Sequence, residues 1–322
     1  MSVRLCMLAR DEADKLPSVA EAVGHMIDDW IILLDNRSRD RTEQVAREVL
    51  PAPGRVERFR FQNFSQARNA LFDAARPDAD WLLLSDPDTP PRGQLPDPLD
   101  EGIYDCEWRS GGETWRLPIL VHASVDCAYV GACHEYLAGG PDHQPAPSLH
   151  VEVAYKPPNP ERLEWFIELL TPDATARDPR SAFYLAQTYR QLGRTDEAFG
   201  WYMRRAQMGH GWIEETWHAV YQAAALVAQL DEELAAVLWK RCISMRPGRA
   251  EPYWQLARAA NSRERHAEAL AWANAGLGLG PNREDTLFVN RWIENTGLSE
   301  QFAQAVTGLR PTAPPTVEAE HG

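Results

Sequence analysis

Four strand-like runs alternate with helical spacing over the first 86 residues. Residues 3–9 begin the pattern, and residues 30–34 form a continuous apolar run of the kind that is buried on both faces of a parallel sheet. Residues 55–61 alternate apolar and basic positions, as a strand near a sheet edge does, and residues 81–85 form the fourth run. The order predicts a doubly wound α/β sheet whose ligands bind at the C-terminal ends of the strands.

Helical periodicity fills the intervals between these runs. Apolar residues recur at helical spacing from Leu16 to Met26, and a second amphipathic pattern covers residues 42–50. We predict a third helix after residue 65, with Ser65 as its N-cap. Residues 90–160 are rich in Pro and Gly, with strand candidates at 114–121 and 125–130. They are expected to extend the sheet irregularly and complete a pocket.

A helical repeat follows from about residue 161. Ala186 and Ala198 in one segment have the same spacing as Ala257 and Ala269 in another, and a degenerate copy covers residues 221–247. Small residues at such positions, with a period near ~34 residues and a final proline, are typical of tetratricopeptide repeats, each a helix pair. The predicted organisation is therefore an α/β domain over residues 1–156, an all-α repeat domain over 157–310 that begins with a Pro-rich linker at 157–160, and a disordered tail over 311–322.

Composition limits the classes of function and of site. The formal net charge is −14, with the acidic excess concentrated in residues 1–155, and an acidic surface repels nucleic-acid backbones. None of the five cysteines forms a Cys-x-x-Cys pair, which argues against a disulfide framework or a structural zinc site. The sequence also lacks a transmembrane pattern and a signal-peptide layout, so we expect a cytoplasmic protein.

Two carboxylates mark the end of the fourth strand. Asp86 and Asp88 directly follow the apolar run at residues 81–85. Two acids one residue apart can hold Mg²⁺ or Mn²⁺, which prefer oxygen ligands and bridge diphosphates. A cation placed there can neutralise the diphosphate that leaves when a nucleotide–sugar bond breaks. The alternative is a solvated acidic turn.

Other polar residues converge on the same edge of the sheet. Asp35 ends the second strand, where an acid can accept hydrogen bonds from a nucleobase or a ribose, and Asp11 and Glu12 follow the first strand. Glu12 is equally suited to the N-terminus of the next helix, and Ser38 or Asp40 to capping the helix that follows.

The third helix adds a cation to this edge. Arg68 and Asn69 lie early in it, and Arg68 is suited to hold a pyrophosphate or to organise the neighbouring acids. A surface salt bridge is the alternative for Arg68.

Together these motifs resemble family-2 glycosyltransferases of the GT-A fold, and more narrowly the bacterial and phage branch with tetratricopeptide repeats, which includes the bacteriocin S-glycosyltransferases. The resemblance is carried by Leu5-Cys6-Met7 with Asp11-Glu12, the Asp-x-x-Ser-x-Asp-x-Thr pattern at 35–42, the Phe-Ser-x-Ala-Arg-Asn element at 64–69, and the Asp-x-Asp at 86–88. It implies a nucleoside-diphosphate-sugar donor, with a UDP-sugar favoured, bound by Asp11, Glu12, Asp35, Arg68, Asn69 and Asp86.

The resemblance also assigns roles to a His-Glu pair after a glycine. His134 is implied as a third ligand of the Mn²⁺ or Mg²⁺ ion beside Asp86 and Asp88, with His150 and His122 as weaker alternatives. Glu135 is implied as the general base that deprotonates the acceptor.

Three departures from the family pattern stand out. Pro87 and Thr89 replace residues of an Asp-Ala-Asp-Glu-like run, which puts a third carboxylate in doubt. Asn36-Arg37 replaces a small Thr-Gly, so Arg37 is placed to change the preference for base or sugar. Arg10-Asp11 replaces Lys-Asn.

The resulting hypothesis is a metal-dependent, inverting glycosyltransferase that modifies a macromolecular acceptor, either a peptide or protein or a glycan. The repeats are expected to form a concave surface for that acceptor or for a second subunit, with exposed aromatics drawn from Trp201, Tyr202, Trp212, Trp217 and Trp254. One alternative is a hydroxymethylated pyrimidine in phage DNA, which requires a basic strip from the Arg-rich sets at 177–194, 204–205 and 241–265. Another is a non-catalytic repeat scaffold with a decayed transferase domain.

Overall fold

A computed structural model describes residues 1–51, 53–110, 113–154 and 157–310. The chain divides into two compact units, Met1–Leu169 and Leu170–Gly322. The first unit reaches past the expected boundary at residue 156, because the first half of helix α4 (Pro160–Thr175) belongs to it. The expected disordered tail at 311–322 lies outside the described residues, as do residues 155–156.

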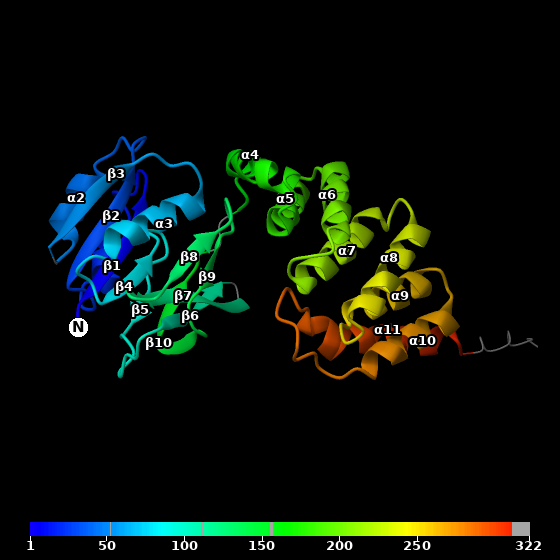
Figure 1. The fold of residues 1–322 in the computed structure, drawn as a ribbon. Helices are drawn as coiled ribbons and strands as arrows, with labels where there is room; N and C mark the ends of the chain where they lie inside the picture. Colours follow the sequence, from blue (N-terminus) through cyan, green and yellow to red (C-terminus); the bar gives the residue numbers. More distant parts are fainter. Residues whose placement is uncertain (52, 111–112, 155–156, 311–322) are drawn as a thin grey trace, which may run out of the picture. The chain divides into compact units, whose positions relative to one another are not determined.

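The first unit is built on an eight-stranded mixed sheet (Figure 1). Its order is β3-β2-β1-β4-β7-β6-β10-β5, and β3, β2, β1 and β4 run parallel. A separate ribbon pairs β8 with β9. The strands are β1 Val3–Ala9, β2 Asp29–Asp35, β3 Gly54–Phe59, β4 Trp81–Ser85, β5 Arg92–Gly93, β6 Ile103–Ser110, β7 Glu113–His122, β8 Cys127–Val130, β9 Tyr136–Gly139 and β10 Gln144–Glu152.

Helices cover both faces of the parallel part of the sheet. Helices α1 (Leu16–Val23) and α2 (Thr42–Val49) share a core with Leu5 and Met7 of β1, whereas α3 (Phe64–Ala75) packs on the opposite face with Cys6. Side chains alternate between the faces of a strand, so one strand serves both cores. This confirms the predicted α/β class, with the C-terminal ends of β1, β2 and β4 at one edge.

The start of α3 corrects one prediction. Its N-cap is Asn63, whose Oδ1 accepts a hydrogen bond from the Gln66 N–H at 2.8 Å, so the predicted N-cap at Ser65 is wrong. Ser65 lies within the first turn, where its hydroxyl donates to Asn63 Oδ1. Asn and Ser are comparable caps, and the chain direction at residue 63 decides between them.

The second unit is helical and contains three antiparallel pairs, as the repeat pattern predicts. They are α5/α6 (Pro179–Gln191, Thr195–Gln207), α7/α8 (Ile213–Val227, Glu232–Met245) and α9/α10 (Glu251–Ser262, His266–Leu277), followed by η1 (Ile293–Gly297) and α11 (Leu298–Gly308). Of the repeat's small residues, Ala186, Ala198, Ala257 and Ala269 are fully buried. Small side chains at these positions let paired helices approach closely.

Of the five aromatic residues named as candidates for the concave surface, two are buried. Tyr202 and Trp217 are fully buried in the repeat core, so neither presents an exposed ring, whereas Trp212 is 43% exposed. Trp239 is also buried. Among the described residues, no helix is both long and apolar enough to cross a bilayer.

Candidate active site

The polar residues predicted for the site gather where β1, β2 and β4 end. Asp11 and Glu12 follow β1, Asp35 is the last residue of β2, and Asp86 comes directly after β4. Parallel pairing of β1 with both β2 and β4 places these strand ends side by side. A covering helix, α3, brings Arg68 to the same edge.

Arg68 joins two carboxylates from distant parts of the chain. Its Nε donates to Glu135 Oε1 at 2.6 Å, and its Nη2 lies 3.1 Å from Asp86 Oδ2. The guanidinium also lies over the Tyr129 ring, 5.3 Å from its centroid. The Arg68 side chain is 19% exposed and that of Glu135 is 11% exposed. Arg68 is therefore a largely enclosed link between β4, the β8–β9 ribbon and α3, and not a surface salt bridge.

The acids around Arg68 stabilise its positive charge. Burial by itself lowers the pKa of Arg68, but the negative charges of Asp86 and Glu135 outweigh it and raise that pKa. Burial raises the pKa of Tyr129, so its hydroxyl stays protonated. Tyr129 is not among the residues predicted for the site, because a single aromatic residue in a short strand carries no signal for a site.

Asn69 is hydrogen-bonded to the backbone of β8. Its Nδ2 donates to the Tyr129 carbonyl at 2.9 Å, and its Oδ1 accepts from the Tyr129 N–H at 2.7 Å. This reciprocal pair fixes β8 against α3 and so positions the Tyr129 ring beside Arg68. The structure gives Asn69 a positioning role, and its predicted contact with the donor stays a prediction.

Asp88 lies in a second acidic group. Burial raises the pKa of Glu12, and the neighbouring charge of Asp88 adds to that increase. Lys15 forms an ion pair with Glu12, and Asp88 also contributes to raising the pKa of Lys15. Asp88 is exposed and Thr89 is buried. Asp86 thus contacts Arg68, whereas Asp88 lies close enough to Glu12 and Lys15 for its charge to raise the pKa of both.

Asp35 is paired by its own neighbour. The Arg37 guanidinium lies 2.6 Å from Asp35 Oδ2 through Nη2, and the Arg37 N–H donates to Asp35 Oδ1 at 2.9 Å. Burial opposes ionisation of Asp35, but these hydrogen bonds outweigh it and lower its pKa. Arg37 also lies over the Phe61 ring at 5.6 Å. The carboxylate predicted to read a nucleobase is therefore held by the residue that departs from the family pattern.

Asp11 connects the loop after β1 to the loop after β2 by hydrogen bonds. Its Oδ1 accepts from the backbone N–H groups of Arg39 at 2.7 Å and Asp40 at 3.2 Å. The hydrogen bond from Arg39 contributes most to lowering the pKa of Asp11. In return, Asp40 Oδ2 accepts from the Ala13 N–H at 3.0 Å and Asp40 Oδ1 from the Thr42 N–H at 2.9 Å. Asp11 thus fixes the loop after β2. Asp40 accepts from the first N–H of α2, but the N-cap position itself is Arg41, so the predicted capping residue lies one position before the N-cap.

His134 lies exposed beside Glu135, with a positive φ of 52°. Its ring is 5.7 Å from that of Phe166 in the first half of α4, which also contacts Phe64. His122 packs on Trp81, at the N-terminal end of β4 and away from Asp86. His150 pairs with Arg92 of β5. Neither weaker alternative lies at the strand ends that carry the acids.

The described residues contain no group of three or more His, Cys, Asp or Glu side chains that could together hold a metal ion. Asp86, Asp88 and His134 are therefore not preformed as a three-ligand centre. Mg²⁺ is commonly bound through one or two carboxylates together with substrate phosphates and water, and Asp88 offers an exposed carboxylate. The oxygen donors present fit such a cation, and the metal assignment stays a prediction.

Comparison with known proteins identifies the N-terminal region. Residues 5–95 match the model of the family described as Glycosyl transferase family 2. The matched segment contains β1 to β4, with Asp11, Asp35, Arg68, Asp86 and Asp88. A TPR repeat-containing protein of Synechococcus elongatus is 40% identical over 86 residues, which are 27% of this chain and 20% of that protein. The match thus spans about a fifth of the relative's length.

The chain is similar to several solved structures, with low TM-scores. MamA matches with a TM-score of 0.32 at 16% identity, covering 44% of this chain and 85% of that chain. The TPR2B domain of yeast Sti1, solved in a complex with pHsp70, matches with a TM-score of 0.32 at 17% identity, covering 40% and 96%. The assignment of tetratricopeptide-like repeats rests on the three helix pairs and their buried small residues.

Proposed function

Because residues 5–95 form a family-2 glycosyltransferase domain, we propose that this protein moves a sugar from a nucleoside-diphosphate sugar to a macromolecular acceptor. The observation that carries the proposal is the cluster of Arg68, Asp86 and Glu135 at the C-terminal edge of the parallel strands, beside the exposed Asp88. In open α/β sheets ligands bind at this edge. The cluster combines a fixed cation with carboxylates, as transfer from a diphosphate requires.

We assign the departing diphosphate to the side of the cluster that carries Asp88. Asp88 is the residue that would hold a Mg²⁺ or Mn²⁺ ion, with Asp86 beside it and His134 as a further candidate, and such an ion would neutralise charge on the diphosphate. Arg68 is already oriented by two carboxylates, so it needs little reorganisation to face new negative charge.

Glu135 is the candidate general base. Its Oε1 accepts from Arg68 Nε at 2.6 Å, so one oxygen of this carboxylate is engaged with a cation. The second oxygen of such a group can accept a proton from an acceptor hydroxyl or thiol. Attack from the face opposite the leaving diphosphate would invert the anomeric centre.

The nucleoside is assigned to the end of β2. Asp35 and Arg37 form a bidentate pair there, with Phe61 beneath the guanidinium. A donor base would meet the Arg37–Asp35 pair as a unit, with the guanidinium as hydrogen-bond donor. We favour a UDP-sugar as donor on the family resemblance. Glu12 borders the diphosphate side through its proximity to Asp88.

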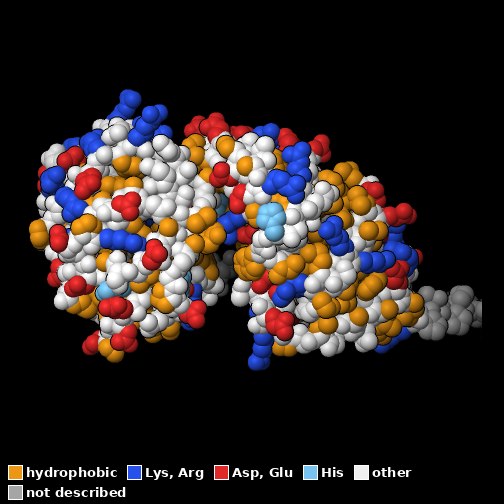
Figure 2. Space-filling model, in the orientation of Figure 1, with side chains coloured by type: hydrophobic (Ala, Val, Ile, Leu, Met, Phe, Trp, Pro, Cys, Tyr) orange, Lys and Arg blue, Asp and Glu red, His pale blue; other side chains and the backbone are white. Residues whose placement is uncertain are grey.

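The acceptor is proposed to be a peptide, a protein or a glycan rather than DNA. Within the Arg-rich sets of the repeat unit, many arginines are paired with acids: Arg180 and Arg205 with Glu215, Arg194 with Glu197, Arg249 with Glu251, Arg263 with Glu232, and Arg265 with Glu232 and Glu268. Figure 2 likewise shows groups of basic side chains next to acidic ones on the drawn face. Paired arginines attract phosphate backbones weakly.

The test is release of nucleoside diphosphate from a panel of UDP-, GDP- and TDP-sugars with Mn²⁺. Wild-type protein should release the diphosphate of one preferred donor, and Asp88→Asn should lower that rate by roughly 100-fold or more. Asp73→Asn, a change on the exposed side of α3, is the matched control and should leave the rate unchanged. Equal, slow release by wild type and Asp88→Asn with every donor would instead support the non-catalytic scaffold.

A further inference from the structure

The chain departs from the repeat pattern immediately after α10. Pro281 follows Pro247 by one repeat length, and Pro247 leads directly into α9. A further helix would be expected to start soon after Pro281. Instead, residues 282–290, which we name the return segment, form no helix and run over the side chains of α7 and α9. Helical structure resumes at Arg291, directly before η1 (Ile293–Gly297).

Buried charged side chains hold the backbone of the return segment. Glu214 Oε2 of α7 accepts from the N–H groups of Thr286 at 2.9 Å and Leu287 at 2.7 Å. Glu251 Oε1 of α9 accepts from the Asn290 N–H at 3.1 Å. Both glutamates are less than 10% exposed. Carboxylates that accept backbone N–H groups recognise the path of a peptide rather than its sequence.

Arg249 supplies the complementary donors. Its Nη1 donates to the Leu287 carbonyl at 3.0 Å and its Nη2 to the Phe288 carbonyl at 3.2 Å. The Arg249 guanidinium lies 4.0 Å from the centroid of the Trp217 ring, and Glu251 Oε1 accepts from its Nη2 at 2.8 Å. Arg249 is 1% exposed, so its fixed geometry is set by the repeat core.

Side chains of the return segment add selectivity. Asp285 is buried and forms an ion pair with Arg246 at the end of α8. Leu287 packs against the repeat core, and the Phe288 ring lies 4.8 Å from that of His218. The recognised pattern is thus an acid followed, after one residue, by Leu and Phe.

The backbone of Phe288 has a conformation that its residue type disfavours. Its φ is 50°, in the left-handed region that a bulky side chain rarely adopts, and 53% of the residue is exposed. Strain of this kind persists only where surrounding contacts impose it. Detachment of the return segment would therefore relieve this backbone strain.

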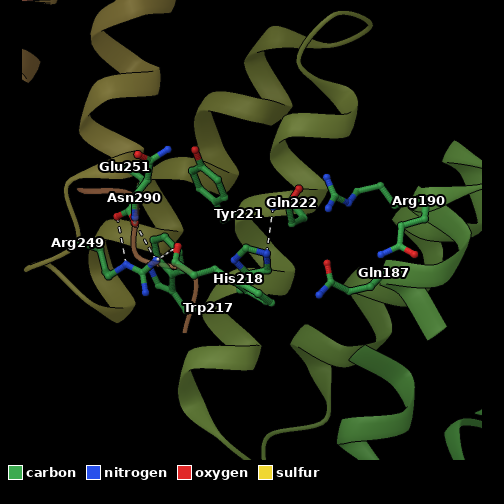
Figure 3. A pocket seen from close by; sticks show the side chains of 11 residues that line it. Gln187, Arg190, Trp217, His218, Tyr221, Gln222, Arg249, Glu251 and Asn290 are labelled. Atoms are coloured by element: carbon green, nitrogen blue, oxygen red, sulfur yellow. Dashed lines mark hydrogen bonds and ion pairs between the residues drawn. The ribbon is translucent and has the colours of Figure 1, made fainter. Parts of the chain in front are cut away.

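An open pocket of about 360 Å³ adjoins the return segment. Figure 3 shows Arg249, Glu251 and Asn290 together at one end, and Gln187 and Arg190 of α5 at the other. His218 lies between these two ends, and Phe288 is also among the residues that line the pocket. A chain that replaced the return segment would have room to continue along α5.

We propose that the face of α7 and α9 is a binding site for a partner peptide of the type Asp-x-Leu-Phe, and that the return segment is its resident competitor. The acid of the partner peptide forms an ion pair with Arg246. Its backbone forms hydrogen bonds with Glu214, Arg249 and Glu251. Its Leu-Phe pair occupies the positions of Leu287 and Phe288. Release of the return segment relieves the left-handed conformation of Phe288. This site is separate from the donor-binding domain and does not depend on its chemistry.

The probe is a fluorescein-labelled, end-blocked peptide that copies residues 282–291, added to the full chain without nucleotide or metal. We expect at least tenfold tighter binding to the variant Asp285→Ala with Leu287→Ala, whose own segment is loosened, than to wild type. Adding Glu214→Gln to that variant should weaken binding again. A peptide with Asp and Phe exchanged is the matched control and should bind at least tenfold more weakly.

Hydrogen exchange of wild type tests the same idea without any variant. The amides of Thr286, Leu287 and Asn290 should exchange at least tenfold faster than the amides in the middle of α9, because the segment opens locally. Exchange of these amides together with α9 would make the segment a fixed part of the fold and overturn the proposal. So would equal affinity of the peptide for wild type and a loosened variant that keeps wild-type helicity.

Discussion

The Nε atom of Arg68 lies 2.6 Å from Oε1 of Glu135, a residue 67 positions further along the chain. The same guanidinium contacts Asp86, which follows β4. One side chain therefore assembles acids from two segments that the sequence keeps apart. The Arg68–Glu135 contact connects the covering helix to the candidate base, and it makes Arg68 the first residue to test.

Replacing Arg68 should damage both activity and stability. Arg68→Ala leaves Asp86 and Glu135 facing each other without their cation, which we expect to cost roughly 3 kcal/mol of unfolding free energy. Release of nucleoside diphosphate should fall by about 100-fold or more. Urea unfolding and the donor assay measure the two effects. Arg47→Ala removes an exposed i,i+4 pair on α2 and should cost less than about 0.5 kcal/mol. Similar losses for both variants would contradict the bridging role.

Arg37 should control which nucleotide is bound. Arg37→Ala frees the buried Asp35 carboxylate to accept hydrogen bonds from a base, so the order of affinities among UDP, GDP and TDP should change by at least about tenfold. Calorimetric titration with Mn²⁺ measures it. Arg39→Ala is the control, because Arg39 binds Asp11 through its backbone N–H and keeps that contact. An unchanged order in Arg37→Ala would argue that the nucleoside binds elsewhere.

Asn69 should matter as a brace. Asn69→Asp keeps an acceptor for the Tyr129 N–H but loses the donor to the Tyr129 carbonyl, which leaves that carbonyl without its partner. We expect a loss of roughly 1–3 kcal/mol of unfolding free energy. Hydrogen exchange at residues 127–130 should accelerate, while exchange in the repeat unit should not change. Wild-type stability together with a loss of donor binding would instead favour direct contact with the nucleotide.

His218 should make the repeat unit sensitive to mild acid. Burial, followed by the charges of Arg249 and Arg190, lowers the pKa of His218 to about 3, from an ordinary value near 6.5. Below pH ~6.5 the unfolded chain binds a proton that the folded chain refuses until about pH 3. Stability is therefore complete above that upper value and falls as the pH drops, by about 1 kcal/mol per pH unit from this group.

Urea unfolding between pH 7 and pH 4 checks this expectation. His218→Leu should remove that part of the slope. His210→Leu, at an exposed position, is the matched control and should keep it. A slope that is the same in wild type and His218→Leu would show that the histidine does not cause the acid sensitivity.

Patterns of local origin could be read from the sequence. The continuous apolar runs at 30–34 and 81–85 indicate buried parallel strands, and β2 and β4 lie where those runs are. Small residues at fixed spacing likewise indicate the helical repeat, because each helix pair packs on its neighbour. The strand ends also place Asp35 and Asp86 at one edge, since parallel strands bring their C-terminal ends together.

Pairings across long separations were decided by the tertiary structure. The sequence suggested that Asp11, Asp35 and Asn69 face a donor. Within the fold Asp11 accepts from the Arg39 N–H and Asn69 binds the Tyr129 backbone, which lie 28 and 60 positions away. Asp35 is the local exception, because it pairs with Arg37 two residues further on. The return segment is a similar case, because its contacts with Glu214 lie 72 and 73 positions away in the chain. Spacing along the chain determines which face a residue occupies, whereas the partner of a buried polar group is fixed only once the whole core closes around it.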